Sequence, residues 1–240
     1  MAKRARKTKN QQHQGDVIQL NAFRSRERQV TMIPKNLRQE DYIELLDNLN
    51  KHIVFAMGPA GTGKTLLGVL AAIKDLRQGK CEKIIVTRPA VSVDEQHGYL
   101  PGTLVEKMAP WTRPIFDVFE EYWTPQQIEL MIADGVIEIA PLAYMRGRTF
   151  KHAWIIADEM QNATPSQMKM LLTRLGEGSK MAVTGDLNQA DRMKDNGLID
   201  FINQLTRFGN STHLDYVTFD HQDIERHNAV KEVLEVYGDE

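Results

Sequence analysis

The most constraining feature of the sequence is a glycine-rich segment, Gly58-Pro59-Ala60-Gly61-Thr62-Gly63-Lys64-Thr65. It matches the pattern G-x-x-x-x-G-K-[ST] of the phosphate-binding P-loop, and it follows an apolar run and precedes a helical segment, as that loop requires. Glycines let the backbone wrap closely around phosphate oxygens, and the start of the next helix attracts the anion. We therefore predict that the whole segment binds a nucleoside triphosphate.

Two side chains of the loop and two acids further along the chain provide the expected chemistry of this site. Lys64 is predicted to reach the β- and γ-phosphates, and the hydroxyl of Thr65 to bind Mg²⁺. A P-loop also needs a carboxylate for the metal at the end of a neighbouring buried strand, and Asp158 follows the apolar run 153–157. The adjacent Glu159 is placed to polarise an attacking water, which favours hydrolysis over transfer to a bound hydroxyl. Magnesium-dependent hydrolysis of ATP is the expected activity.

A polar loop, Thr184-Gly185-Asp186-Leu187-Asn188-Gln189, follows the next apolar run. A loop at the tip of a central strand lies beside the γ-phosphate in open α/β sheets. Gln189 is therefore predicted to sense that phosphate through its amide, although the same residues taken alone would make an ordinary turn.

Short apolar runs and helix-like segments alternate along the chain. The apolar runs cover residues 53–57, 84–86, 136–140, 153–157, 180–183 and 214–219. The helix-like segments cover residues 64–77, 114–122, 125–133, 165–175, 198–207 and 223–237, and an earlier one begins at Asn36. Continuous apolar runs are typical of strands buried on both faces. The predicted class is α/β, with a mostly parallel sheet flanked by helices.

Local signals mark where several of these helices begin. Asn36 is a candidate N-cap, and Thr124-Pro125 and Thr164-Pro165 each place a capping hydroxyl before a proline at the first helical position.

The length of 240 residues suits one core with extensions rather than two cores. Residues 1–28 carry eight Lys and Arg against Asp16 and Glu27, a local charge of +6 that leaves −8 for the remainder. We expect residues 1–33 to be a largely disordered basic tail, with a short strand or arm near its end, and residues 34–240 to be the catalytic domain. The tail's charge either engages phosphate backbones or simply keeps the tail solvated.

The sequence also indicates where the protein is found and whether it contains disulfides. No run of 18 apolar residues and no signal peptide is present, so a soluble cytoplasmic protein without membrane contact is expected. The single cysteine, Cys81, excludes an internal disulfide and a cysteine metal site, and is expected to pack. Residues 1–33 are too short for a nuclease domain, so nuclease activity is not expected.

Seven further segments stand out: Thr87-Arg88-Pro89-Ala90-Val91, Gly98-Tyr99-Leu100-Pro101-Gly102, Glu106-Lys107-Met108, Met145-Arg146-Gly147-Arg148-Thr149, Asp158-Glu159-Met160-Gln161-Asn162, Gln167-Met168-Lys169-Met170 and Thr184-Gly185-Asp186. Together with the P-loop, they closely resemble the PhoH-like ATPases over about residues 34 to 237. The resemblance implies a RecA-like P-loop core related to superfamily 1 helicases, ATPase activity, a link to RNA metabolism and often a ring of subunits.

The resemblance also suggests roles for individual residues. Gln39 resembles the glutamine that contacts adenine in these helicases, and otherwise would be a solvated helix residue. Arg88, Arg146 and Arg148 are candidate contacts to a nucleic-acid backbone, with a structural salt bridge as the alternative for each. Arg226 resembles a late family arginine that could act as an arginine finger.

Two alternatives attach to these suggestions. Arg226 could instead form an ordinary helix-surface pair with Asp223 or Glu225.

Residues 88–135 are longer than a simple crossover needs, and we interpret them as an insertion that lines an RNA path. Within it, Trp111 and Trp123 are available for base stacking, with packing as the alternative.

The leading hypothesis is a nucleic-acid-dependent ATPase, plausibly an RNA helicase acting on single-stranded RNA. About 205 residues after Pro34 suffice for one RecA-like domain. A second wall of the ATP site is then expected from a neighbouring subunit of a homo-oligomer, with a hexamer suspected and Arg226 as its candidate arginine. The alternatives are an ATP-gated module that recruits an RNA-processing partner, and a small-molecule kinase, against which Glu159 and Gln189 argue.

Overall fold

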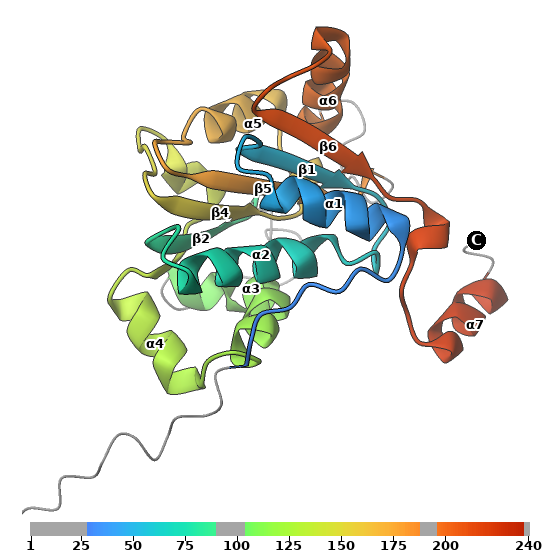
Figure 1. The fold of residues 1–240 in the computed structure, drawn as a ribbon, viewed down its shortest axis with the longest axis horizontal. Coiled ribbons are helices and arrows are strands. Elements are labelled where there is room, and N and C mark those ends of the chain that lie inside the picture. The colour runs from blue at the N-terminus through green and yellow to red at the C-terminus, as the bar shows by residue number, and fades with distance from the viewer. Residues whose placement is uncertain (1–27, 90–103, 188–195, 238–240) are drawn as a thin grey trace, which may run out of the picture.

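The computed structural model describes residues 28–89, 104–187 and 196–237 (Figure 1). Three predictions fall outside these residues: the tail over residues 1–27, the segment 98–102 and the sensor Gln189.

The described residues form one six-stranded sheet in which every neighbouring pair is parallel. Its strands are β1 (Ile53–Met57), β2 (Lys83–Thr87), β3 (Ile137–Ile139), β4 (Ala153–Ala157), β5 (Lys180–Gly185) and β6 (Leu214–Thr218). The order across the sheet is β3-β2-β4-β5-β1-β6. Because β5 lies between β1 and β4, the segments that follow these three strands emerge side by side. The predicted RecA-like α/β class is confirmed.

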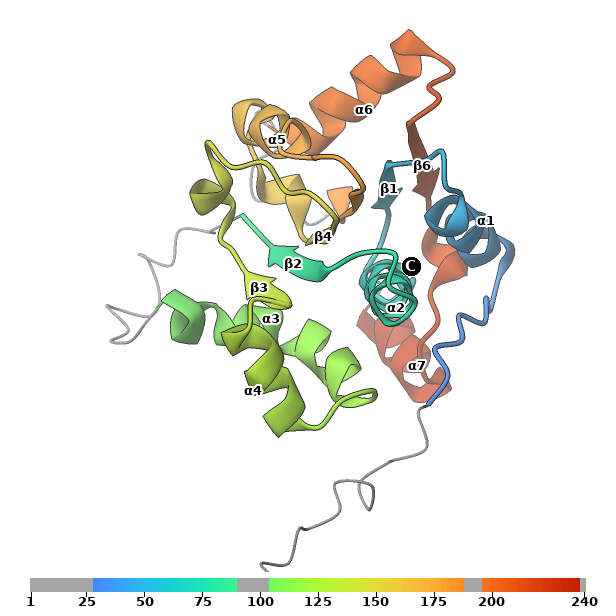
Figure 2. The same ribbon diagram turned by 60° about the vertical axis from the view of Figure 1, so that its left-hand side comes forward.

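Helices cover both faces of the sheet (Figures 1 and 2). One face carries α1 (Leu37–Asp47), α2 (Lys64–Arg77) and α3 (Leu104–Glu120), with α4 (Pro125–Ala133) beside β3. The other face carries α5 (Pro165–Leu172), α6 (Gly197–Phe208) and the 3₁₀ turns η3 (Leu142–Met145) and η4 (Met160–Asn162). The chain then continues through η6 (His221–Asp223) to α7 (Asn228–Tyr237).

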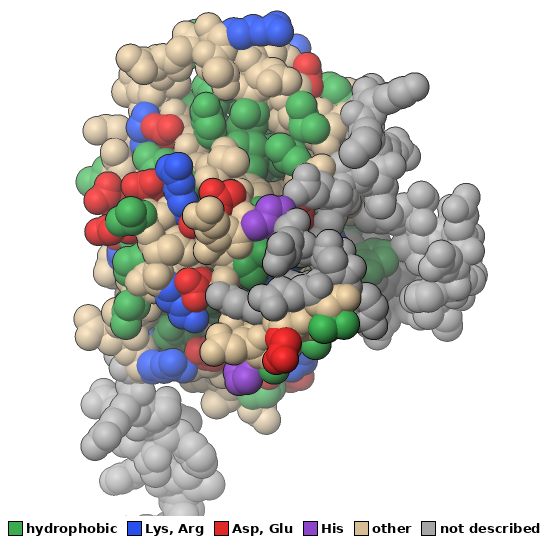
Figure 3. Space-filling model, turned by 90° about the vertical axis from the view of Figure 1, so that its right-hand side faces the viewer, with side chains coloured by type: hydrophobic (Ala, Val, Ile, Leu, Met, Phe, Trp, Pro, Cys, Tyr) green, Lys and Arg blue, Asp and Glu red, His purple; other side chains and the backbone are tan. Residues whose placement is uncertain are grey.

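The surface of the described residues mixes side chains of all kinds. On the face shown in Figure 3, acidic and basic side chains are interspersed among hydrophobic and neutral ones. Of the described helices, none combines the length and apolar character needed to cross a bilayer.

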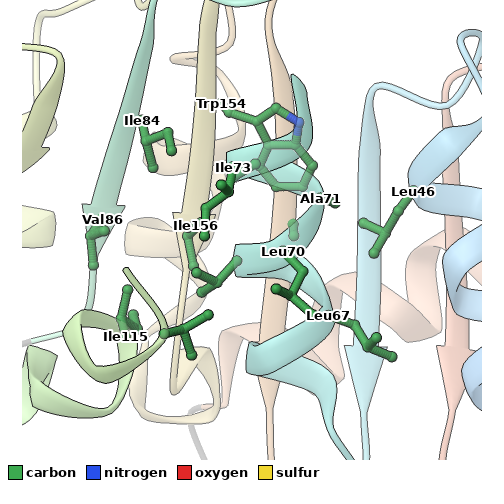
Figure 4. Packing of buried hydrophobic residues seen from close by; sticks show 14 of the residues in the cluster. Leu46, Leu67, Leu70, Ala71, Ile73, Ile84, Val86, Ile115, Trp154 and Ile156 are labelled. Atoms are coloured by element: carbon green, nitrogen blue, oxygen red, sulfur yellow. The ribbon is translucent and has the colours of Figure 1, made fainter. Parts of the chain in front are cut away.

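One hydrophobic cluster lies where α2 packs across the sheet, and a second lies on the opposite face, beneath α5 and α6. Leu70 and Ile73 of α2 face the side chains of Ile156 and Trp154 on β4 (Figure 4). The indole Nε1 of Trp154 donates to Asp75 Oδ2 at 2.9 Å, so this largest core side chain buries no unpaired donor. Burying each large apolar side chain contributes about 1.5–3 kcal/mol, which fixes α2 and therefore the P-loop before it.

The three predicted helix starts are confirmed. The Asn36 side chain accepts from the backbone of Gln39, and Thr124 and Thr164 each form a capping box with the glutamine three residues on.

Two helix starts were predicted wrongly, and the helix predicted over residues 165–175 ends at Leu172. The helix expected from Pro114 begins at Leu104, because Ile115 and Phe119 anchor it in the core and this packing outweighs the local cost of proline. The helix expected from Asp223 begins at Asn228. The intervening residues are held by a bond to the P-loop instead, as described below.

Residues 88–135 are integrated with the core where they are described. Phe119 and Ile128 are buried in the cluster beneath α2, and Trp123 packs against it with its ring centroid 5.8 Å from that of Phe119. The packing alternative therefore holds for Trp123. The arm at residues 28–33 has no regular structure, and Val30 and Met32 pack against the same cluster.

Lys180, at the start of β5, generates a prediction about stability. Its Nζ donates to the carbonyls of Leu45, Leu46 and Asn48 at the end of α1, at 3.3 Å to Leu45 and 2.9 Å to Asn48. We expect Lys180→Met to lower the free energy of unfolding by about 1–2 kcal/mol, since partly buried carbonyls at the end of α1 lose a charged donor. Urea denaturation measures this. Lys169→Met, at an exposed lysine, is the control, and an equal loss there would contradict the assignment.

Candidate nucleotide-binding site

A pocket of about 280 Å³ opens where β1, β4 and β5 end. It is lined by Ala60, Gly61, Gly63, Lys64, Thr65, Leu66, Asp158, Glu159, Thr184, Gly185 and Asp186. The sheet thus brings together the P-loop, the paired acids and the Thr184-Gly185-Asp186 segment, which are far apart in sequence. Open α/β sheets bind ligands at this carboxyl edge.

The P-loop adopts a conformation that only glycine tolerates well. Gly58 and Gly61 have φ of 142° and 87°. A Cβ on Gly58 would lie 2.4 Å from the carbonyl oxygen of Phe219, and one on Gly61 would lie 2.5 Å from Arg226 Nε. Helix α2 begins directly after the loop, and its N-cap, Gly63, provides no side-chain bond to the first amides. These amides are therefore oriented to receive an anion.

Lys64 is buried in the loop. Its Nζ donates to the carbonyls of Gly58 at 2.7 Å and Pro59 at 2.6 Å. Burial lowers the pKa of Lys64, while the nearby carboxylates of Asp186, Asp158 and Glu159 act in the opposite direction. The ammonium is thus held at the phosphate-binding loop on bonds that phosphate oxygens can replace.

The residues present fit a magnesium ion. The Thr65 hydroxyl donates to Asp158 Oδ1 at 2.8 Å, and the Thr184 hydroxyl donates to the same oxygen. Mg²⁺ prefers such oxygen ligands, and in nucleotide sites it takes one or two from protein and the rest from phosphate and water. The described residues contain no cluster of three or more His, Cys, Asp or Glu with metal-site geometry. If the ion binds in this pocket, Thr65 and Asp158 are the side chains that would hold it.

Glu159 stands beside Asp158 in a rare backbone conformation. Its φ of 55° and ψ of 36° lie in the left-handed region, which costs a non-glycine residue about 1–2 kcal/mol. Its carboxylate accepts a hydrogen bond from Gln161 Nε2. An otherwise unfavourable conformation is thus maintained at a residue that lines the pocket.

Gln39 reaches the P-loop from the first turn of α1. It is buried, with Nε2 donating to the carbonyl of Thr62 at 3.0 Å and Oε1 accepting from the Lys35 backbone at 2.9 Å. The structure therefore places this predicted adenine contact beside the loop rather than on a solvated face. Both ends of its amide already have backbone partners.

The segment after β6 returns to the P-loop of its own chain. The Phe219 amide donates to Met57 O at 2.7 Å, and the Glu225 amide donates to Gly61 O at 3.0 Å. Arg226 follows and lies against Gly61. It precedes α7 rather than lying on it, so the expected helix-surface position is wrong, and no ion pair among the described residues includes it.

The three candidate nucleic-acid arginines have different environments. Arg148 forms a bidentate ion pair with Glu138, with Nη2 2.9 Å from Oε2, and its guanidinium lies 4.5 Å from the centroid of the Phe150 ring. The salt-bridge alternative is confirmed for this residue. Arg88 donates to the carbonyl of Trp111 at 3.3 Å, whereas Arg146 is exposed on the surface after η3.

Comparison with known proteins places the chain. A family model described as "PhoH-like protein" matches residues 31–238. The chain belongs to the PhoH-like family. The resemblance recognised in the sequence is thereby confirmed.

Similar proteins carry the same family name. The chain is 43% identical over 213 residues to a PhoH-like protein of Mycobacterium tuberculosis (strain ATCC 25618 / H37Rv), covering 87% of this chain and 58% of that protein. It is 44% identical over 205 residues to a PhoH-like protein of Bacillus subtilis, covering 85% and 63%. Identity to the PhoH protein of Escherichia coli K12 is 39% over 217 residues, covering 86% and 58%. The chain thus spans about three fifths of the length of these relatives.

Solved structures similar to this PhoH-like chain include helicases. The UvsW helicase of bacteriophage T4 superposes with a TM-score of 0.44 at 12% identity, over 78% of this chain and 61% of that one. The Pif1 helicase of Candida albicans gives a TM-score of 0.40 at 15% identity, over 85% and 43%.

Sequence reasoning left without a role two pocket residues, Thr184 and Asp186, and the buried Gln161 beside them. Thr184 contacts the metal carboxylate, and the Asp186 amide donates to Gln161 Oε1 at 3.1 Å. The available signal was position, since Thr184 and Asp186 flank Gly185 at the end of an apolar run. Glycine at position 185 allows Gln161 to come this close, because a Cβ there would lie 3.0 Å from Gln161 Oε1.

The Arg148–Glu138 pair predicts a pH-dependent stability. The hydrogen bond from Arg148 holds the pKa of Glu138 below its ordinary value of 4.5. A depressed carboxyl pKa stabilises the fold above the unfolded pKa and ceases to do so as the pH falls through the folded pKa. We expect Arg148→Met to lower the free energy of unfolding at pH 7 by up to about 1 kcal/mol, and this deficit to shrink below pH 4.5.

Urea denaturation of both proteins across this pH range provides the measurement. Arg146→Met, at the exposed arginine two positions earlier, is the matched control and should change stability little. A deficit that is independent of pH would contradict the ion-pair assignment.

Proposed function

We propose that this PhoH-like chain is a Mg²⁺-dependent ATPase whose hydrolysis is stimulated by nucleic acid, with single-stranded RNA as the favoured polymer and helicase action as its expected use. The observation that supports it best is the convergence of Lys64, the Thr65–Asp158 pair and Glu159 on one pocket. This set contains a phosphate cation, metal ligands and a base for water. A kinase would instead deliver the phosphate to a bound hydroxyl.

The residues divide the work as follows. The P-loop amides and Lys64 bind the β- and γ-phosphates and neutralise charge that grows on the leaving oxygen. Thr65 and Asp158 hold Mg²⁺, which when bound offsets phosphate charge. Glu159 orients a water in line with the γ-phosphate and accepts its proton. Gln189 remains the proposed γ-phosphate sensor, and Gln39 the proposed adenine contact after exchanging a backbone bond.

Nucleic-acid contact is proposed at the carboxyl edge of the sheet. Arg88 directly follows β2, and the exposed Arg146 follows η3, so both lie on segments that leave this edge. Arg148 could bind a nucleic-acid phosphate only if its ion pair with Glu138 were broken, so it is the weakest of the three candidates. The choice of RNA rests on the family resemblance.

A ring of subunits, with six suspected, is proposed to supply the second wall of each site. The sequence hypothesis assigned Arg226 to the site of a neighbouring subunit. We revise this assignment, because Arg226 lies against Gly61 of its own chain. We propose that Arg226 serves the nucleotide of its own subunit, and that a neighbour contributes surface rather than this side chain.

Steady-state ATP hydrolysis tests the proposed function. Wild-type protein should hydrolyse ATP only with Mg²⁺ and faster with single-stranded RNA, more so at low salt. Glu159→Gln should reduce kcat by about 100-fold or more, since removing a general base costs this much. Lys64→Ala should reduce it by a similar factor, because it removes a charge that stabilises the transition state. Single-stranded DNA and Lys169→Ala, at an exposed lysine outside the pocket, are the controls.

Three outcomes would redirect the assignment. Hydrolysis indifferent to both polymers would favour the ATP-gated interaction module. A phosphorylated metabolite would favour the kinase. No hydrolysis under any condition would refute the proposal.

Mixing two inactive variants tests where Arg226 acts. If it serves its own subunit, Lys64→Ala and Arg226→Ala proteins should remain inactive after mixing and exchange. If it served a neighbour, mixed rings would pair an intact Lys64 with an intact Arg226 and recover part of the activity. Native mass spectrometry of the mixture establishes whether mixed rings form, and a recovered rate would contradict the assignment to the same subunit.

A further inference from the structure

Gln161 is a buried glutamine that joins two parts of the pocket. Only 1% of its surface is exposed, and it lies on η4, between the strand that carries Glu159 and helix α5. Its Nε2 donates to Glu159 Oε2, while its Oε1 accepts from the Asp186 backbone amide at 3.1 Å. One side chain therefore links the end of β4 to the end of β5.

The surroundings leave this side chain little freedom. A Cβ on Gly185 would lie 3.0 Å from Gln161 Oε1, so the bond to Asp186 requires glycine or a shift at that position. On the other side, the Gly197 amide donates to Ala163 O at 2.7 Å and fixes η4 against the start of α6. A buried amide held this closely keeps one orientation.

Both partners of Gln161 act on the pocket. Glu159 is the proposed base, and its left-handed backbone gives its carboxylate no regular support from a helix or strand. Asp186 lines the pocket and is the carboxylate that most strongly favours the charged form of Lys64. The link thus connects the water-activating residue to the strand end that faces the phosphate lysine.

We propose that Gln161 is a positioning residue that fixes the Glu159 carboxylate for attack and ties it to the segment after β5. The side-chain amide of Gln161 donates a hydrogen bond to Oε2 of Glu159. Oε1 of Glu159 then accepts the proton of the attacking water. Changes in the segment after β5 are then passed to the base through one side chain. This inference rests on the proposed ATPase function.

Two substitutions separate the two bonds of Gln161. Gln161→Met removes both bonds at similar volume, whereas Gln161→Glu keeps an acceptor for the Asp186 amide but places a carboxylate against Glu159. We expect both to lower kcat by about 10- to 100-fold, the usual effect of removing a partner that orients a reacting group. KM and the affinity for a fluorescent ATP analogue should change less than threefold. Gln127→Met is the matched control. In the wild type, Gln127 Oε1 accepts a hydrogen bond from the Thr124 backbone amide at 2.8 Å, far from the pocket.

A double-mutant cycle shows whether Gln161 acts through Glu159. In the Glu159→Gln background, adding Gln161→Met should leave kcat within about twofold of Glu159→Gln alone, because the group being positioned is already absent. Thermal unfolding of every variant distinguishes positioning from loss of fold. If Gln161→Met does not fold, Gln161→Glu is used in the same cycle.

The outcomes distinguish this inference from the proposed function. Absence of hydrolysis by wild-type protein would refute the ATPase itself. If the wild type is active and the Gln161 variants hydrolyse ATP at the same rate, only the positioning role is refuted. The same holds if Gln161→Met lowers kcat by the same factor in the wild-type and Glu159→Gln backgrounds. A loss of nucleotide affinity without a loss of kcat would also refute it.

Discussion

The parallel pairing of β5 with both β1 and β4 is the constraint on which the pocket depends. Met57 aligns with Gly185, and Ala157 aligns with Val183, so the three strands end within two residues of one another along the sheet. The P-loop, Asp158 and Thr184 therefore meet without any long side chain. The Thr65–Asp158 hydrogen bond is a direct result of this register, because it spans β5 from the segment after β1 to the segment after β4.

The P-loop is also enclosed by elements from both ends of the domain. α1 contributes Gln39 on one side, and the segment after β6 contributes Phe219 and Arg226 on the other. The two sides are joined, since Asn36 Nδ2 donates to the carbonyl of Asp223 at 3.3 Å. The glycines of the loop therefore meet two requirements, phosphate access and close packing. A substitution at Gly58 or Gly61 would disturb both at once.

Local signals in the sequence were sufficient for much of this description. The strands at 53–57 and 153–157 and the helices at 64–77 and 125–133 have the predicted bounds, because continuous apolar runs and capping residues are short-range features. The P-loop and the paired acids were recognisable for the same reason. The starts of α3 and α7 were not recognisable in the sequence. Packing in the core decides the start of α3, and the hydrogen bond from Glu225 to Gly61 decides that of α7.

The sequence by itself determined the class of the fold, the phosphate loop and the family, because each depends on residue types at fixed short spacings. Only the tertiary structure decided that Arg148 is paired with Glu138, that Arg226 lies against its own P-loop and that Gln161 links Glu159 to Asp186. These contacts join residues whose proximity depends on strand order and on the path of connecting segments. Such proximity is set by packing across the sheet, which no local pattern records.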